Sequence, residues 1–212
     1  MAALSNSRRV WAGLAGALAL ASLLSPIAAL AGPVGEQVVR GNVSFSRQGD
    51  LTVIRASNNS IINYQSFDIA RQETVRFIQP SAAARVLNRI QGAAPTRIDG
   101  ALLANGHVYI VNPAGVYFGP SAIVDVAGIH AAAGNISNED FLAGIDHFVG
   151  VVGEVVNRGT ILGQAVTLVG TRVANYGSIV AERGSVVMAA GDEVLVGRRD
   201  GHIFAKVSAT AA

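Results

Sequence analysis

The chain of 212 residues contains no cysteine, one lysine and few aromatic residues, which make up 6% of it. Without cysteine no disulfide can form, so packing and backbone hydrogen bonds alone must hold the fold. Half of the residues are hydrophobic, and 24 are glycine. A chain of this length and composition can bury the core of one domain.

The local motifs of common enzyme and metal sites are also missing. The sequence has no G-x-S-x-G, P-loop, H-E-x-x-H or G-G-x-G-x-D motif. Its histidines have neither metal-ligand spacing nor cysteine partners; they are His107, His130, His147 and His202. Glu139-Asp140 and Asp192-Glu193 are adjacent acids, and neighbours in a strand face opposite ways, so neither pair forms a catalytic dyad. We therefore expect no enzyme, no metal and no cofactor.

Charge of one sign is not in excess once residues 1–31 are set aside. They hold Arg8 and Arg9 and no acid, so Lys plus Arg falls from 16 to 14 and equals the 14 Asp plus Glu. A chain near zero net charge has no general attraction for nucleic acid or acidic lipid. We expect partners other than nucleic acid.

Residues 1–31 have the three parts of a secretory signal peptide. Arg8-Arg9 precede an apolar stretch, Val10–Leu24, and Ala29-Leu30-Ala31 forms a small-residue cleavage site. We expect export by the Sec machinery and cleavage before Gly32. An uncleaved membrane anchor is the alternative, because Val10–Leu30 is long enough to span a bilayer. The small residues at the cut favour cleavage.

Two turns of an internal repeat follow each other in the C-terminal half. Val156–Ile161 (VNRGTI) returns 18 residues later as Ala174–Ile179 (ANYGSI), and Val166–Val169 returns 20 residues later as Val186–Ala189. A period of about 20 residues with two or three short strands is the signature of a β-solenoid. The leucine-rich repeat has a similar length, but its L-x-x-L-x-L frame is missing. The repeat predicts a parallel β-helix of about eight or nine coils.

Turn residues mark the corners of these coils. Within Ile98–Asp125, short apolar runs are separated by Asn105-Gly106, Asn112-Pro113, Gly115 and Gly119-Pro120. Asparagine and glycine tolerate positive φ and proline presets a turn, so the pattern predicts strands of about four to six residues joined by tight corners.

Two asparagines of the repeat mark a corner of their own. Asn157 and Asn175 each lie two residues before a glycine, Gly159 and Gly177. We expect them to form a stacked amide pair, one coil apart, with a left-handed backbone.

The remaining segments predict a cap, a few strands and one helix. Expected elements are a hairpin or first coil of Gln37–Phe45 and Leu51–Arg55 around Gln48-Gly49-Asp50, strands at Ser60–Ile69 and Thr74–Ile78, a helical turn at Ser81–Ala84 and a short helix at Asn138–Ala143. Ser137 or Asn138 caps that helix, with acids in its first turn. Residues 205–212 have no pattern, and we expect a disordered tail there.

Five ordered segments of this chain recur in one known family. They are Ser60–Ile69 (SIINYQSFDI), Glu73–Pro80 (ETVRFIQP), Val86–Gly92 (VLNRIQG), Gly100–Gly119 (GALLANGHVYIVNPAGVYFG) and Ile136–Phe141 (ISNEDF). Together they resemble the N-terminal domain of filamentous-haemagglutinin-like proteins, the exoproteins of two-partner secretion (TPS). The likeness covers roughly Gly35–Val196, and the order and spacing of the motifs make it specific.

The resemblance implies a right-handed parallel β-helix with an N-terminal β cap, over residues 32–204. It also implies a function. The POTRA domains of a dedicated outer-membrane transporter recognise such a domain in the periplasm and start export of the exoprotein to the cell surface. In relatives the exoprotein continues into an adhesin, cytolysin or toxin portion, and we expect a role in adhesion here. The family's N-P-N-G-I motif corresponds to Asn112-Pro113-Ala114-Gly115-Val116. Asn112, Pro113, Gly115 and Val116 are therefore candidates for transporter recognition.

Several alternatives remain open at this stage. Asn112–Val116 can be a plain type I turn that closes a corner, a recognition site, or both. An exposed edge around Val38–Phe45 or Leu51–Arg55 can pair with a transporter strand, and more solenoid can stack on the C-terminal coil. A carbohydrate-active β-helix and an adhesive solenoid that binds host or cell-surface glycans or proteins are the rival functions.

Overall fold

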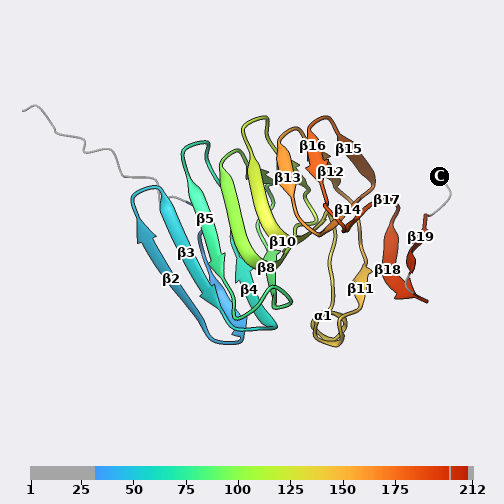
Figure 1. Ribbon diagram of the computed structural model, residues 1–212, viewed down its shortest axis with the longest axis horizontal. Helices are drawn as coiled ribbons and strands as arrows, with labels where there is room; N and C mark the ends of the chain where they lie inside the picture. The colour runs from blue at the N-terminus through green and yellow to red at the C-terminus, as the bar shows by residue number, and fades with distance from the viewer. Residues whose placement is uncertain (1–31, 201, 210–212) are drawn as a thin grey trace, which may run out of the picture.

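The computed structural model describes residues 32–200 and 202–209, which form one elongated rod (Figure 1). The predicted signal peptide, residues 1–31, lies outside the described residues. The rod is a right-handed parallel β-helix of about six turns with one short helix. The predicted fold class is confirmed, but eight or nine coils were too many. The N-terminal hairpin, the insertion between β10 and β12 and the C-terminal hairpin take up chain without adding coils.

Three β-strands form the N-terminal cap. They are β1 (Gln37–Arg40), β2 (Val43–Gln48) and β3 (Leu51–Ala56). β2 and β3 make the predicted antiparallel hairpin, in which Gln48 pairs with Leu51. β1 is separate from this hairpin and pairs antiparallel with the first strand of another face. The cap therefore begins two faces of the rod.

Three parallel faces make up the body of the rod. The first face contains β3, β5 (Thr74–Ile78), the first half of β8 (Ala101–Val111), the first half of β10 (Ile123–Ala132), β13 (Thr160–Leu162) and β16 (Ser178–Val180). The second face contains β4 (Ser60–Tyr64), β6 (Arg85–Ile90), the second halves of β8 and β10, β14 (Ala165–Gly170) and β17 (Ser185–Ala190). The third face contains β7 (Thr96–Ile98), β9 (Val116–Phe118), β12 (Glu154–Asn157) and β15 (Arg172–Asn175).

Strand β8 corrects one expectation from the sequence. Asn105-Gly106 does not separate two strands, because the 11 residues of β8 run on through a register shift against β10 at this point. The Asn105 amide exchanges hydrogen bonds with the backbone of Gln79 on the preceding coil, at 2.8 and 2.7 Å. The contact between Asn105 and Gln79 lets β8 bend from the first face to the second without ending.

Aliphatic side chains stack inside the rod, one above the other in successive coils. On the second face, Val86, Val108, Ile129 and Val166 form one such column, and each is at most 1% exposed. The alternation of a strand points every second residue inward, and neighbouring strands lie about 4.8 Å apart, so equivalent residues meet directly. Each fully buried Val or Ile contributes about 1.5–3 kcal/mol. This buried apolar core, called the main core cluster below, stabilises the fold in the absence of disulfides.

A second layer covers the outer side of the second face. This covering layer consists of α1 (Asn138–Ala143), β11 (Asp146–Phe148), β18 (Glu193–Arg199) and β19 (His202–Ser208). β11, β18 and β19 form an antiparallel sheet. Beneath the layer lies a second apolar cluster, which includes Leu87, Val111, Phe141, Phe148 and Val169.

The helix of the covering layer has the predicted bounds and cap. The Ser137 hydroxyl accepts a hydrogen bond from the Asp140 backbone N–H, and Gly144 closes the helix in the left-handed conformation. The predicted disordered tail is wrong for residues 205–208. They form most of β19, because their backbone pairs with β18 and supplies the hydrogen bonds that a loose tail would lack. Residues 210–212 lie outside the described residues.

Candidate functional site

The Asn112 motif forms a corner between β8 and β9. The Gly115 backbone N–H donates to the Asn112 carbonyl at 2.9 Å, which closes a four-residue turn over Pro113 and Ala114. The Asn112 side chain fixes this turn, since its Oδ1 accepts from the Ala114 N–H at 3.0 Å. Its Nδ2 donates to the Ala94 carbonyl and the Thr96 hydroxyl, at 3.0 and 3.1 Å. One amide thereby joins its own corner to the corner of the preceding coil.

Burial limits what a partner can touch at this corner. Asn112 is 0% exposed, and Gly115 and Val116 are buried as well. Pro113 and Ala114 are half-exposed. In the folded domain the Asn112 side chain is therefore a structural element of the corner, and within Asn112–Val116 only the two central residues of the turn are accessible from outside.

Close stacking of corners explains the glycine of the motif. Gly115 has a φ of +120°, which disfavours other residues, and a Cβ there would lie 3.0 Å from the Glu154 carbonyl oxygen on the next coil. Gly153, in that next corner, has even less room, since a Cβ there would lie 2.5 Å from the Pro113 carbonyl oxygen. The motif is therefore enclosed between two other corners of the rod.

The predicted asparagine pair is present on the third face. Asn157 lies opposite Asn175 in the β12–β15 register, and its Nδ2 donates to the Asn175 Oδ1 at 2.8 Å. The predicted left-handed backbone is wrong, because neither asparagine is among the positive-φ residues. Gly159 and Gly177 are needed for space instead, since a Cβ on Gly177 would lie 2.1 Å from the Gly159 carbonyl oxygen.

Two strands of the cap have a free edge among the described residues. β1 pairs with β4 alone and β2 pairs with β3 alone. Leu51–Arg55, expected as an alternative edge, is not one, because β3 lies between β2 and β5. A groove of about 510 Å³ lies at the β1–β2 connection, lined by Val38, Gly41, Asn42, Val43, Ser44, Arg55, Ala56, Ser57 and Ile78. The free edges and the groove offer unpaired backbone groups to an extended chain.

Side chains of the cap hold these edges in place. Arg47 of β2 donates to the Glu36 carboxylate at 3.0 Å and to the Pro33 carbonyl at 2.8 Å. Its guanidinium also lies over the Phe45 ring, 5.7 Å from the centroid. The Glu73 carboxylate accepts from the Gly32 and Ala70 backbone N–H groups. The cap is thereby tied to the first coil.

A buried polar cluster under the covering layer has no counterpart in the sequence analysis. His107 Nδ1 lies 3.3 Å from His130 Nε2, and the His130 ring stacks on Tyr109. The Tyr109 hydroxyl donates to Asp146 of β11 at 2.8 Å. The distance between these residues in the sequence could have indicated the cluster. Tyr109 and His130 are 21 residues apart, about one coil, and they stack because β8 pairs with β10 in this register.

Burial dominates the electrostatics of this cluster. Burial, together with smaller contributions from the nearby His107 and Arg85, lowers the pKa of His130 to about 3. Burial also raises the pKa of Asp146, although the Tyr109 hydrogen bond opposes this shift. The pKa of Tyr109 is raised by burial and by the Asp146 charge. His130 is therefore neutral at physiological pH.

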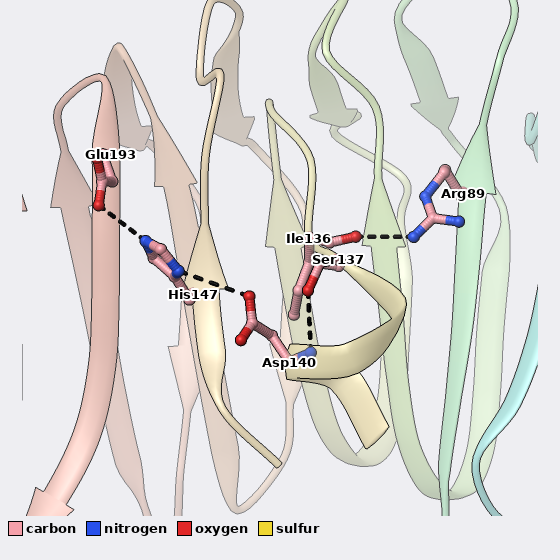
Figure 2. A network of polar contacts seen from close by, with 6 residues as sticks. All are labelled: Arg89, Ile136, Ser137, Asp140, His147 and Glu193. Atoms are coloured by element: carbon pink, nitrogen blue, oxygen red, sulfur yellow. Dashed lines mark hydrogen bonds and ion pairs between the residues drawn. The ribbon is translucent and has the colours of Figure 1, made fainter. Parts of the chain in front are cut away.

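A surface network connects the covering layer to the rod (Figure 2). His147 of β11 lies between two carboxylates, with Nε2 2.8 Å from Glu193 Oε1 and Nδ1 3.5 Å from Asp140 Oδ2. On the other side of α1, Arg89 of β6 donates to the Ile136 carbonyl at 2.7 Å. The network thus joins β6, the start of α1, β11 and β18.

The described part of the chain shows neither a metal cluster nor a membrane span. Within residues 32–200 and 202–209, no group of three or more His, Cys, Asp or Glu side chains is arranged to hold a metal ion. Over the same residues, no helix has the length and apolar character needed to cross a membrane. The predicted signal peptide and its alternative, a membrane anchor, lie outside them.

Known proteins match this chain in both sequence and structure. Residues 34–211 match the family model of the TPS secretion domain. The crystal structure of the HMW1 secretion domain from Haemophilus influenzae superposes with a TM-score of 0.79 and 32% identity, over 85% of this chain and 50% of that one. Two proteins of Haemophilus influenzae, both named heme/hemopexin-binding protein, are 38% and 36% identical over 100 and 101 residues.

The matched lengths are unequal. Each alignment with a heme/hemopexin-binding protein covers 47% of this chain and 11% of the relative, so the similarity concerns a small part of those proteins. The family model, by contrast, covers almost the whole described structure, cap and covering layer included. The chain therefore belongs to the TPS secretion domain family of haemagglutinin-like exoproteins.

Proposed function

We propose that POTRA domains of an outer-membrane transporter recognise this domain in the periplasm and start export of an adhesive exoprotein to the cell surface. The family is one of exported secretion domains rather than of enzymes, and membership implies an outer-membrane transporter as the partner. The observation that carries the proposal is the pair of free cap edges beside the β1–β2 groove. They allow strand addition, in which backbone pairing supplies affinity and side-chain pockets supply specificity.

The site of contact follows from exposure. Asn112 is buried, so in the folded domain its motif cannot present its first side chain to a partner. β2 is the better surface, because its outward residues Ser44 and Ser46 are exposed and its outer backbone edge is unpaired within the described chain. We assign the folded motif to corner stability and the cap edge to recognition.

Site-specific photocrosslinking tests this assignment. A photoreactive residue replaces Ser46 on β2 in one variant and Ser178 on β16 in the other, and both serines are exposed. With purified POTRA domains, we expect crosslinks from position 46 and none from position 178. Crosslinks from position 178 alone would overturn the cap-edge assignment.

The carbohydrate-active alternative is not favoured. The relatives that match are secretion domains and exoproteins. Glu154 and Arg172, two exposed charges of the third face, are engaged with each other in a two-point ion pair at 2.9 and 2.7 Å. We further propose that the Sec machinery delivers the chain and that host or cell-surface glycans or proteins are its final contacts.

A further inference from the structure

The covering layer meets the rod at a cluster of titratable side chains, of which His130 and Tyr109 are buried and His107 and Asp146 are half-buried. From the rod, β8 contributes His107 and Tyr109, and β10 contributes His130. From the layer, β11 contributes Asp146, which Tyr109 holds at 2.8 Å. Tyr109 also meets the Phe141 ring of α1, edge to face. The layer and the rod therefore meet across this cluster.

The two histidines and Asp146 lie close together across the interface. His130 Nδ1 is buried, makes no hydrogen bond and lies 3.5 Å from Asp146 Oδ2. His130 Nε2 lies 3.3 Å from His107 Nδ1, and either ring can donate in this contact. The contact is lost when both rings are protonated, because both facing nitrogens then carry a hydrogen.

Adding protons to this cluster is unfavourable in the closed structure. The charged group from β6 is Arg85, whose cation lowers the pKa of both histidines. The group from β18 is Arg198, which lines a cavity of about 280 Å³ together with His130, Asp146, Thr167 and Ser185. Asp146 is the one carboxylate among these residues. Protonating the histidines therefore places positive charge among two arginines and a single acid.

We propose that the covering layer is an acid-sensitive lid, which stays closed while His107 and His130 are neutral and separates from the second face when they take up protons. The main core cluster inside the rod consists of apolar side chains and Tyr64, and neither histidine belongs to it. Opening exposes the apolar outer side of the second face, including Leu87, Val111 and Val169.

The direction of the effect follows from proton linkage. A histidine exposed by opening has a pKa near 6.5, whereas closure holds the pKa of His130 at about 3. The open state thus binds more protons between these values, and acid favours opening. Asp146, with its raised pKa, binds more protons when closed and opposes the trend. We expect a net change on the order of tenfold in the opening equilibrium between pH 7.5 and 5.0.

Hydrogen exchange of the full chain at these two pH values measures the opening. After correction for intrinsic exchange rates, protection of β11 and β18 is expected to fall about tenfold at pH 5.0, while β10 keeps its protection. Equal protection of β11 and β18 at both pH values overturns the proposal. Equal losses in the layer and in β10 also overturn it, because they indicate global unfolding.

Variants test which residues cause the pH dependence of protection in the covering layer. The double variant His130→Phe/Asp146→Asn keeps a ring on Tyr109 and an acceptor for its hydroxyl, and it is expected to keep only the part of the pH response that His107 contributes. The matched controls His147→Gln and His202→Gln remove histidines of the layer outside the cluster and are expected to keep it. A response that disappears with His147→Gln overturns the proposal. If the double variant does not fold, His107→Gln replaces it, with a response reduced at least threefold expected and an unchanged response contradicting the lid.

Discussion

The Asn112 side chain donates a hydrogen bond to the Thr96 hydroxyl, 3.1 Å away at the corner of the preceding coil. Both residues are buried, at 0% and 1% exposure. Asn112, the first residue of the family motif, therefore links two coils by hydrogen bonds. A motif that looks like a recognition sequence acts, in the folded domain, as part of the corner itself.

Replacing Asn112 with Ala is expected to destabilise the domain by about 2–4 kcal/mol. The change removes three hydrogen bonds and leaves the Ala94 carbonyl, the buried Thr96 hydroxyl and the half-buried Ala114 N–H without that partner. Urea unfolding of the wild type and the variant measures the loss. Pro113→Ala, at the half-exposed centre of the turn, is the control and should cost about 1 kcal/mol or less. Equal unfolding midpoints for the wild type and Asn112→Ala would show that these hydrogen bonds do not stabilise the contact between the two coils.

The two asparagines of the third face should differ in their contribution to stability. Asn157 is fully buried, bonds to Asn175 and also binds the Gly159 N–H, whereas Asn175 lies exposed on the outermost coil. We expect Asn157→Ala to cost about 2 kcal/mol and Asn175→Ala less than about 1 kcal/mol. A double-mutant cycle by urea unfolding should give a coupling of about 0.5–1 kcal/mol. Equal costs for the two single variants would contradict this description of the pair.

Gly159 should not tolerate a side chain, although its φ is not positive. A Cβ would lie 2.6 Å from the Ala122 carbonyl oxygen, and both belong to the stacked corners of the rod. Gly159→Ala is expected to cost about 1–3 kcal/mol through overpacking. The comparison is Gly49→Asn, at an open position with a φ of +54°, where asparagine fits and little change is expected. Thermal unfolding of both variants measures the two effects. An unchanged midpoint for Gly159→Ala would contradict the close stacking of the corners around Gly159.

His147 should hold the C-terminal hairpin, β18 and β19, to β11 and α1 without contributing much to global stability. It contacts Glu193 and Asp140 at a partly exposed site, where ion pairs are worth about 0–1 kcal/mol. His147→Ala is expected to lower hydrogen-exchange protection of β18 and β19 by up to about fivefold and to leave β14 unchanged. Glu193→Gln should give a smaller effect in the same strands. A loss of protection confined to β14 would contradict this description, because it would mean that His147 does not hold the C-terminal hairpin.

The sequence predicts the coils better than their number or their connections. The 18- and 20-residue offsets correctly align Asn157 with Asn175 and Val166 with Val186, because residues that stack must recur at the coil period. The helix at Asn138–Ala143 is predicted as well, since its cap and first-turn acids are local signals. β8 is longer than expected, because Asn105 finds a partner on the preceding coil that local turn rules do not include.

The buried polar cluster and the C-terminal hairpin are the parts that sequence reasoning misses. His107, His130 and Asp146 come from three strands, and the last joins the others only when the insertion folds back over the second face. β19 carries no alternation of buried and exposed residues that would mark it as a strand. Its order comes from pairing with β18, a long-range contact with no local signature.

Export with and without the transporter tests the central claim most directly. The full chain is produced in a Gram-negative host that lacks related transporters, with or without the POTRA-barrel transporter of its own source, and the periplasmic, cell-surface and extracellular fractions are measured. We expect the chain to reach the surface or the medium only when the transporter is present. Equal amounts outside the cell in both strains, or retention in the periplasm in both, would contradict it.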